Sequence, residues 1–326
     1  MTIQDHMVTV GGQRLRVAVR RGDSDRTPLL LMNGIGASLE TFAPLTRRLD
    51  PGLTVISFDV PGVGGSPKPG HPYRFTWLSV LVGRMLDELG FGTVDVLGIS
   101  WGGGLAQQFA FTQRSRCRRL ILVATGTGML MVPGSPRVLA KMITPRRYRD
   151  AGFLRTVAPE LYGGSVRQDP ASTAEFMTGL KAAGARAGYA YQLAAGAGWT
   201  SLGILPLLPQ PTLVLTGDDD PIIPVANGRI LAGLIRGAQL QIYPGGHLEL
   251  AVNPDLLVPA IEAFLTGTRP APAPGGRWGS PAGCLRRVYR LFRLPTPWRL
   301  IPSLGGPARS TPPGGFRTGA ATSPGR

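Results

Sequence analysis

The segment 94–104, VDVLGISWGGG, decides the fold that this sequence predicts. It begins as an apolar strand-like run, and its residues 98–102, GISWG, then match the pattern G-x-S-x-G ahead of a helix-like stretch. A sharp turn from strand to helix forces the serine into a strained backbone conformation, and the flanking glycines remove the Cβ clashes that this turn would cause. The segment therefore predicts that Ser100 is a nucleophile, presented at the end of a sheet strand.

Strand-like and helix-like runs alternate on both sides of this segment. Strand-like runs cover residues 7–10, 15–19, 28–33, 54–60, 93–99, 120–124, 212–215 and 239–243, and helix-like runs cover 75–89, 105–111 and 256–265. The first two runs flank Gly11-Gly12 and are typical of a hairpin. The alternation of the others predicts an α/β fold, with a mostly parallel sheet and helices on both faces.

The stretch 126–210 interrupts this alternation. It has no clear strand and is rich in Gly, Pro, Met and Tyr. Because it lies between two sheet strands, we expect it to be a helical lid insertion. Ligands of open α/β sheets bind at the carboxyl ends of the strands. An insertion that leaves such an end is therefore expected to cover the site.

The predicted nucleophile needs a base, because a serine hydroxyl is otherwise a weak nucleophile. The chain has three histidines, and His247 follows the strand-like run 239–243 within the sequence GGH. His6 lies near the N-terminus and His71 lies in a Pro/Gly loop, so both are expected to be structural. His247 is therefore predicted to be the catalytic base.

A catalytic imidazole also needs a carboxylate that fixes its tautomer and stabilises its cation. Asp218-Asp219-Asp220 directly follows the run 212–215, whereas no acid follows the run 120–124. Asp220 is predicted to be this acid because the pattern G-x-x-D-P places it at the turn of the loop. The other two aspartates are predicted to be solvated neighbours. The order serine, aspartate, histidine is that of the α/β-hydrolase fold.

Acyl transfer further requires hydrogen-bond donors for the developing oxyanion. The main-chain N–H of Trp101, which follows the nucleophile, is one predicted donor. The second is expected from the loop 33–36, NGIG, and we assign it to the N–H of Ile35. The glycine-rich run 59–66 lacks the lysine of a phosphate-binding loop and the spacing of a dinucleotide site, so it is predicted to be structural.

The charge of the chain is concentrated at its C-terminal end. The 326 residues contain 35 Lys+Arg and 19 Asp+Glu, a net charge of +16. Residues 267–326 contain ten Arg, eleven Pro, eleven Gly and no acid, so the preceding residues hold 25 basic against 19 acidic groups, a net charge of +6. We therefore predict a catalytic domain over 1–265 and a disordered Pro/Gly/Arg-rich tail over 266–326. A basic tail is a weak sign of nucleic-acid binding.

The cellular setting is predicted from three features of the sequence. Cys117 and Cys284 lie in no C-x-x-C pair, which argues against a disulfide framework and a structural zinc site. Apolar runs fall far short of the ~18 residues that span a bilayer. The N-terminus lacks the basic start and apolar run of a signal peptide. Together these features predict a cytoplasmic protein without a transmembrane segment.

The motifs together resemble a known family. Residues 33–37, 59–66, 98–103, 217–224 and 246–248 look like those of an α/β-hydrolase. More narrowly, the body resembles the intracellular medium-chain-length poly(3-hydroxyalkanoate) depolymerases. This narrower resemblance rests on the stretches 72–75 (PYRF), 105–110 (LAQQFA), 131–134 (MVPG), 145–148 (PRRY), 162–164 (YGG) and 198–201 (GWTS). It covers about residues 1–265 and leaves out the tail.

The resemblance implies hydrolysis of the ester links of a stored polyester, with release of 3-hydroxy acids through a hydroxyacyl-enzyme. The catalytic residues carry over as Ser100, Asp220 and His247, and no metal or organic cofactor is implied. The apolar approach for such a polymer could come from lid residues, or these residues could form the core of the lid itself. They are Met129, Leu130, Met131, Tyr189, Tyr191 and Trp199.

Other functions stay open at this point. The same scaffold serves small-ester carboxylesterases, cofactor-free haloperoxidases and C–C bond hydrolases, and fold does not choose among them. A non-catalytic basic binding protein would need no ordered triad. Within the tail, Cys284–Ile301 interleaves Arg with apolar residues, so it could form a short amphipathic helix on a granule surface or be an extension without function.

Overall fold

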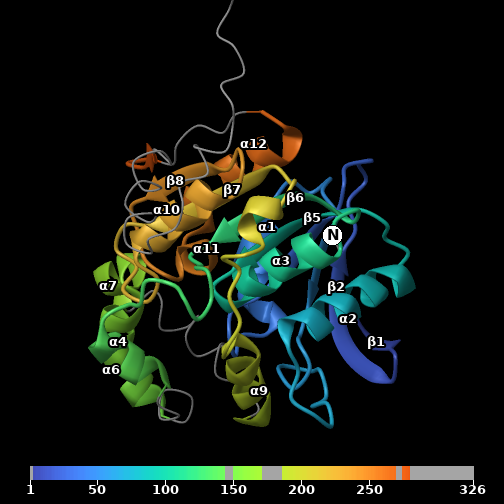
Figure 1. Cartoon of the computed structure of the whole chain (residues 1–326), viewed down its shortest axis with the longest axis horizontal. Coiled ribbons are helices and arrows are strands. Elements are labelled where there is room, and N and C mark those ends of the chain that lie inside the picture. Colours follow the sequence, from blue (N-terminus) through green and yellow to red (C-terminus); the bar gives the residue numbers. More distant parts are fainter. Residues whose placement is uncertain (1–2, 144–149, 171–185, 269–273, 280–326) are drawn as a thin grey trace, which may run out of the picture. The chain divides into compact units, whose positions relative to one another are not determined.

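The computed structural model describes residues 3–143, 150–170, 186–268 and 274–279 (Figure 1). The chain divides into two compact units, residues 1–285 and 286–326. The second unit, and with it most of the predicted tail, lies outside the described residues. The first unit holds all of the described residues. In it, no described helix has both the length and the apolar character needed to cross a bilayer.

A single mixed sheet forms the centre of this unit. Its strands are β1 (Ile3–Val10), β2 (Gln13–Arg20), β3 (Leu29–Met32), β4 (Val55–Phe58), β5 (Val94–Ile99), β6 (Cys117–Val123), β7 (Thr212–Gly217), β8 (Gln239–Tyr243) and β9 (Arg277–Trp278). Their order in the sheet is β1-β2-β4-β3-β5-β6-β7-β8-β9. The strands β3 to β8 run parallel, and β1, β2 and β9 are antiparallel additions at the edges. The predicted hairpin and parallel sheet are thus confirmed.

Helices cover both faces of the sheet, as the alternating pattern predicts. The helices beside the sheet are α1 (Ala43–Arg48), α2 (Phe75–Glu88), α3 (Trp101–Thr112), α10 (Val225–Leu234), α11 (Glu249–Val252) and α12 (Val258–Thr266). One apolar core joins α2, α3 and α10 to the sheet, and a second joins α1, α11 and α12 to its other face. The parallel strands are buried on both faces for this reason, which explains their nearly continuous apolar sequences.

The insertion between β6 and β7 is helical in its described residues. Its elements are α4 (Pro136–Ile143), α6 (Ala151–Tyr162), α7 (Gly164–Gln168), α9 (Arg186–Gly196) and the 3₁₀ turn η2 (Leu205–Leu207). The helices α4, α6 and α7, green in Figure 1, lie together to one side of the sheet. They share a small core with Ile222 and Ile223, which follow β7. The insertion leaves from the carboxyl end of β6, as predicted, and its action as a lid stays a prediction.

One part of the predicted tail belongs to the sheet. The catalytic domain is predicted to end at Leu265, but α12 ends at Thr266 and β9 pairs antiparallel with β8, with Arg277 opposite Ile242. The N–H of Gly279 also donates to the Leu240 carbonyl at 2.8 Å. Disorder from residue 266 onward is therefore wrong for this segment. Ladder hydrogen bonds use only the main chain, so two residues can extend a sheet without the apolar pattern that marks a strand.

Candidate active site

Ser100 occupies the turn between β5 and α3 in a conformation that few residues adopt. Its φ is 54° and its ψ is −121°. The neighbouring glycines make this turn possible. A Cβ on Gly98 would lie 2.4 Å from the Gly102 carbonyl oxygen, and a Cβ on Gly102 would lie 2.1 Å from the Met32 carbonyl oxygen. The predicted strand–turn–helix context of the G-x-S-x-G motif is thus present, with both glycines required by close backbone packing.

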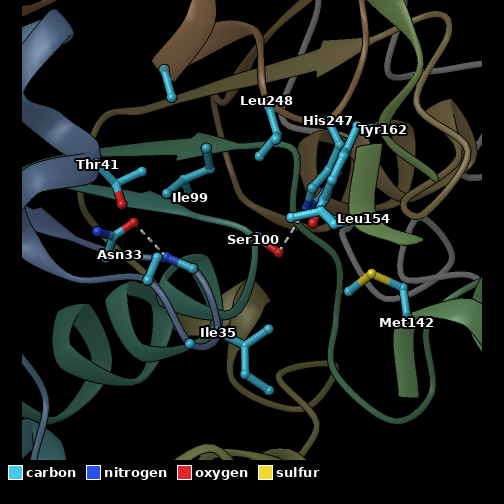
Figure 2. A pocket seen from close by; sticks show the side chains of 14 residues that line it. Asn33, Ile35, Thr41, Ile99, Ser100, Met142, Leu154, Tyr162, His247 and Leu248 are labelled. Atoms are coloured by element: carbon cyan, nitrogen blue, oxygen red, sulfur yellow. Dashed lines mark hydrogen bonds between the residues drawn. The ribbon is translucent and has the colours of Figure 1, made fainter. Parts of the chain in front are cut away.

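Three of the predicted site residues form one hydrogen-bonded chain. His247 Nε2 lies 3.0 Å from Ser100 Oγ, a contact drawn as a dashed line in Figure 2. On the other side of the imidazole ring, His247 Nδ1 lies 2.8 Å from Asp220 Oδ2. Both partners of this second contact are buried. The geometry fits a base that takes the serine proton through Nε2 while a carboxylate holds Nδ1–H.

The carboxylate of Asp220 is fixed by its own loop. Its second oxygen, Oδ1, accepts the main-chain N–H groups of Ile222 and Ile223, both at 2.9 Å. These two bonds fix the carboxylate and orient Oδ2 toward the imidazole.

Asp218 is exposed and the side chain of Asp219 is 41% exposed, as predicted for solvated neighbours, but both aspartates also make hydrogen bonds within the protein. Asp218 Oδ1 accepts the N–H of Gly245 at 3.1 Å, which ties the aspartate loop to the loop before His247. Asp219 Oδ2 accepts the N–H of Gly164 at 2.8 Å, and its Oδ1 pairs with Arg167 at 2.6 Å. Each aspartate of the triplet therefore holds a different segment, which a run of three identical residues cannot reveal.

The loop after β3 is shaped by Asn33. Its side-chain amide donates to the Ser38 carbonyl at 2.6 Å, and its Oδ1 accepts the N–H of Gly34 at 2.9 Å, also drawn in Figure 2. A Cβ on Gly34 would lie 3.6 Å from Ser100 Cβ, so this loop passes directly beside the serine. Among the described residues, no acceptor pairs with the main-chain N–H of Ile35 or Trp101. Both groups are free to receive an oxyanion, the role predicted for them.

The histidine loop is held by residues that sequence reasoning missed. The buried carboxylate of Glu249 accepts the N–H of Ser165 at 2.6 Å, the hydroxyl of Ser165 at 2.8 Å and the N–H of Gly246 at 3.0 Å. It thereby joins α7 of the insertion to the loop that carries His247. A glutamate at a helix start is common, so the sequence offers no signal for this role.

The other two histidines are exposed, His6 on β1 and His71 in the loop before α2.

Two cavities meet at Ser100. The smaller, about 80 Å³, is lined by the loop 33–37, Ser100, Leu154, Tyr162 and His247, several of which Figure 2 shows. The larger, about 310 Å³, is mostly apolar. Its wall includes Phe75, Trp101, Met129, Met131, Tyr189 and Trp199. Four of the six apolar lid residues considered above therefore line a cavity beside the serine. Of the other two, Leu130 is exposed and Tyr191 packs edge-on against Tyr73.

Within the described residues, no three His, Cys, Asp or Glu side chains gather as metal ligands would. What the site offers instead is a hydroxyl, an imidazole, a carboxylate and two free N–H groups. This set suits acyl transfer by a serine nucleophile.

Comparison with known proteins places the chain in a family. A model of the family described as "alpha/beta hydrolase fold" matches residues 27–254, and the chain belongs to this family. Among its relatives, a poly(3-hydroxyalkanoate) depolymerase from Ectopseudomonas oleovorans is 50% identical over 275 residues, which are 82% of this chain and 97% of that protein. The chain is accordingly an ester hydrolase.

More distant relatives share the scaffold. The 3-oxoadipate enol-lactonase 2 of Acinetobacter baylyi is 26% identical over 248 residues, which are 75% of this chain and 90% of that protein. A solved thermophilic esterase from Thermogutta terrifontis superposes with a TM-score of 0.68 at 25% identity, over 81% of this chain and 98% of that one. An enol-lactonase structure from Burkholderia xenovorans gives 0.69 at 24% identity, over 80% of this chain and all of that one, and shows the fold alone.

Proposed function

We propose that this protein hydrolyses the ester bonds of a poly(3-hydroxyalkanoate) and releases 3-hydroxy acids. The observation that carries the proposal is the 50% identity to a poly(3-hydroxyalkanoate) depolymerase, which extends over 97% of that protein's length. The apolar cavity of about 310 Å³ beside Ser100 supports it, because the repeating unit of such a polyester carries an alkyl side chain.

The first half of the proposed reaction acylates Ser100. His247 Nε2 takes the proton of Ser100 Oγ as this oxygen attacks the ester carbonyl carbon. The negative charge that develops on the carbonyl oxygen is bound by the N–H groups of Ile35 and Trp101. The C–O bond to the next unit then breaks, and His247 gives its proton to the leaving alkoxide. Asp220 stays ionised throughout and stabilises the imidazolium.

The second half restores the enzyme. His247 takes a proton from water as the water oxygen attacks the carbonyl carbon of the hydroxyacyl-enzyme. The bond to Ser100 Oγ breaks, the serine regains its proton from His247, and a 3-hydroxy acid leaves. The contacts of 3.0 Å and 2.8 Å at the two imidazole nitrogens support these assignments.

We also propose that the protein works in the cytoplasm at the surface of polyester granules. Among the described residues of the insertion, five large apolar side chains are exposed, Met129, Leu130, Val132, Leu193 and Leu207, and two of them, Met129 and Leu193, also line the larger cavity. Exposed apolar side chains at the cavity suit contact with an apolar polymer. The basic tail is a second candidate for attachment. Removing the residues after 285 and measuring granule partitioning tests it, and unchanged partitioning would exclude the tail.

The decisive experiment measures release of 3-hydroxy acids from amorphous medium-chain polyester by wild type and by Ser100→Ala. Release by the wild type alone supports both the substrate and the nucleophile. If neither protein releases acid but the wild type hydrolyses small esters, the polymer assignment is wrong and a carboxylesterase remains. A small molecule with a hydrolysable C–C bond, included in the same set of substrates, tests whether the protein is a C–C bond hydrolase. Circular dichroism of both proteins checks that they fold.

A further inference from the structure

Gln192 of α9 hydrogen-bonds to Trp101 and to the residue after Ile35, and Ile35 and Trp101 are the residues predicted to supply the oxyanion donors. Its Oε1 accepts the N–H of Gly36, the residue after Ile35, at 2.7 Å. Its main-chain carbonyl accepts the indole N–H of Trp101 at 2.8 Å. The residue is fully buried and lines the larger cavity, together with Ser100 and Ile35. Gln192 thus ties the insertion to the loop of one predicted donor and to the side chain of the residue that supplies the other.

The orientation of the Gln192 amide is set by this contact. Gly36 N–H is a donor, so the oxygen of the amide must face it, and the amide nitrogen then points elsewhere. Among the described residues, no acceptor pairs with Nε2 of Gln192. A buried donor without an acceptor is costly, and such groups in native proteins commonly have a functional reason. Here the unpaired donor belongs to a residue in the wall of a cavity that is otherwise mostly apolar.

The proposed substrate carries an oxygen suited to this donor. Apart from the reacting carboxyl group, the acyl unit of a 3-hydroxyalkanoate has one polar atom, the oxygen on carbon 3. It is a hydroxyl at a chain end and an ester oxygen within the chain, and it accepts a hydrogen bond in both forms. The carbon that bears this oxygen is two bonds from the carbonyl carbon. A carbonyl held by the N–H groups of Ile35 and Trp101 therefore places this oxygen in the cavity that Ile35, Trp101 and Gln192 all line.

We propose that Gln192 Nε2–H binds the oxygen on carbon 3 of the acyl unit that Ser100 accepts, which makes Gln192 a specificity-determining residue. This inference rests on the proposed function for its substrate class. It explains how an apolar cavity would select 3-oxygenated acyl groups over plain fatty acyl groups of equal length. A site that pairs a buried donor with a substrate oxygen rejects the analogue that lacks this oxygen.

The test compares two soluble esters that differ in one oxygen, methyl 3-hydroxyoctanoate and methyl octanoate. We expect Gln192→Met to lower kcat/KM for the 3-hydroxy ester roughly 10–100-fold more than for the plain ester. Loss of the Gly36 contact alone would disturb the oxyanion loop and slow both esters equally, so the ratio of the two values isolates the role of Nε2. Gln192→Asn keeps an amide but withdraws it by one carbon, and it serves if the methionine variant is inactive on both esters.

A matched control is Gln210→Met. Gln210 is also a buried glutamine, and its amide donates to the Ala110 carbonyl at 2.9 Å near the opposite end of α3 from Ser100. Its substitution should leave the ratio unchanged. If the Gln192 variants lose the same factor in kcat/KM on both esters, the ratio is unchanged and the proposal is overturned. Because no polymer is used, this result is independent of whether the wild type degrades the polyester.

Discussion

The main-chain N–H of His247 donates to the carbonyl oxygen of Tyr162 at 2.7 Å. Tyr162 is the last residue of α6, so this bond attaches the loop of the catalytic base directly to the insertion. Next to it, Glu249 bonds Ser165 of α7 and Gly246 of the same loop. The insertion is therefore part of the framework that positions the imidazole, in addition to forming a wall of the cavities.

The first prediction concerns Glu249. Glu249→Ala should lower the free energy of unfolding by about 3 kcal/mol, because it leaves buried donors of Ser165 and Gly246 without an acceptor. Activity should fall as well, since the loop before His247 loses its support. Urea unfolding and ester hydrolysis measure the two effects. Ser165→Ala removes one of the three bonds and should cost only about 1 kcal/mol. Equal stability of Glu249→Ala and wild type would contradict this account.

The second prediction concerns the carboxylate of Asp220. In Asp220→Asn the amide oxygen can still accept from Ile222 and Ile223, so the amide NH₂ faces His247 Nδ1. Nδ1 must then be an acceptor, which places the imidazole proton on Nε2, opposite Ser100. This tautomer cannot take the serine proton, and kcat should fall ~10⁴-fold while the fold is kept. A variant with more than a tenth of wild-type activity would remove Asp220 from its proposed role.

The third prediction concerns the contact between α9 and the glycine-rich loop after β4. A Cβ on Gly188 would lie 1.8 Å from the Gly62 carbonyl oxygen, so Gly188→Ala must push the two segments apart. We expect a loss of about 2 kcal/mol in stability, together with reduced activity, because α9 carries Gln192. Thermal unfolding and ester hydrolysis give the two measurements.

Gly203→Ala is the matched control for this substitution. Gly203 lies in the same insertion, and a Cβ there would have no neighbour within 4 Å. Its effect on stability should stay within about 0.5 kcal/mol. A similar result for both alanine variants would show that the close approach of Gly188 to Gly62 is unimportant.

The fourth prediction concerns Cys117, whose side chain is buried at the start of β6. Burial raises the pKa of this thiol well above its usual range, and the charge of Asp95 raises it further. The thiolate is the reactive form, and it should be absent at about pH 8, where an ordinary cysteine begins to react. In a Cys284→Ser background, labelling by a disulfide reagent should therefore require urea. Rapid labelling of the native protein would contradict the burial.

The sequence predicts those parts of the site that chemistry constrains locally. Ser100 needs its glycines within two residues, and His247 and Asp220 each follow a recognisable strand. The role of Gln192 is an example of what cannot be predicted from the sequence. It contacts Gly36 across 156 residues of chain, and a buried glutamine in a helix has no pattern of its own.

The contacts of the supporting carboxylates escaped prediction for a related reason. Asp219 is partly exposed, as predicted, and its bonds to Gly164 and Arg167 form only because the fold brings these residues beside it. The strand β9 likewise depends on the free edge of β8, which the local composition of the segment does not encode. Roles of this kind depend on tertiary contacts, so they cannot be predicted from a single sequence.

The spacing of the reacting groups along the chain has a consequence for folding. Ser100 and His247 meet across 147 residues, and β6, the insertion and β7 all lie between them. Contacts between such distant positions form only after the entropy of closing a long loop has been overcome. A refolding chain that has built the hairpin and the β3–β5 region therefore still has no working nucleophile. During refolding, ester hydrolysis returns only when β7 and β8 have joined the sheet. The recovery of activity should therefore lag behind the recovery of the helical circular dichroism signal.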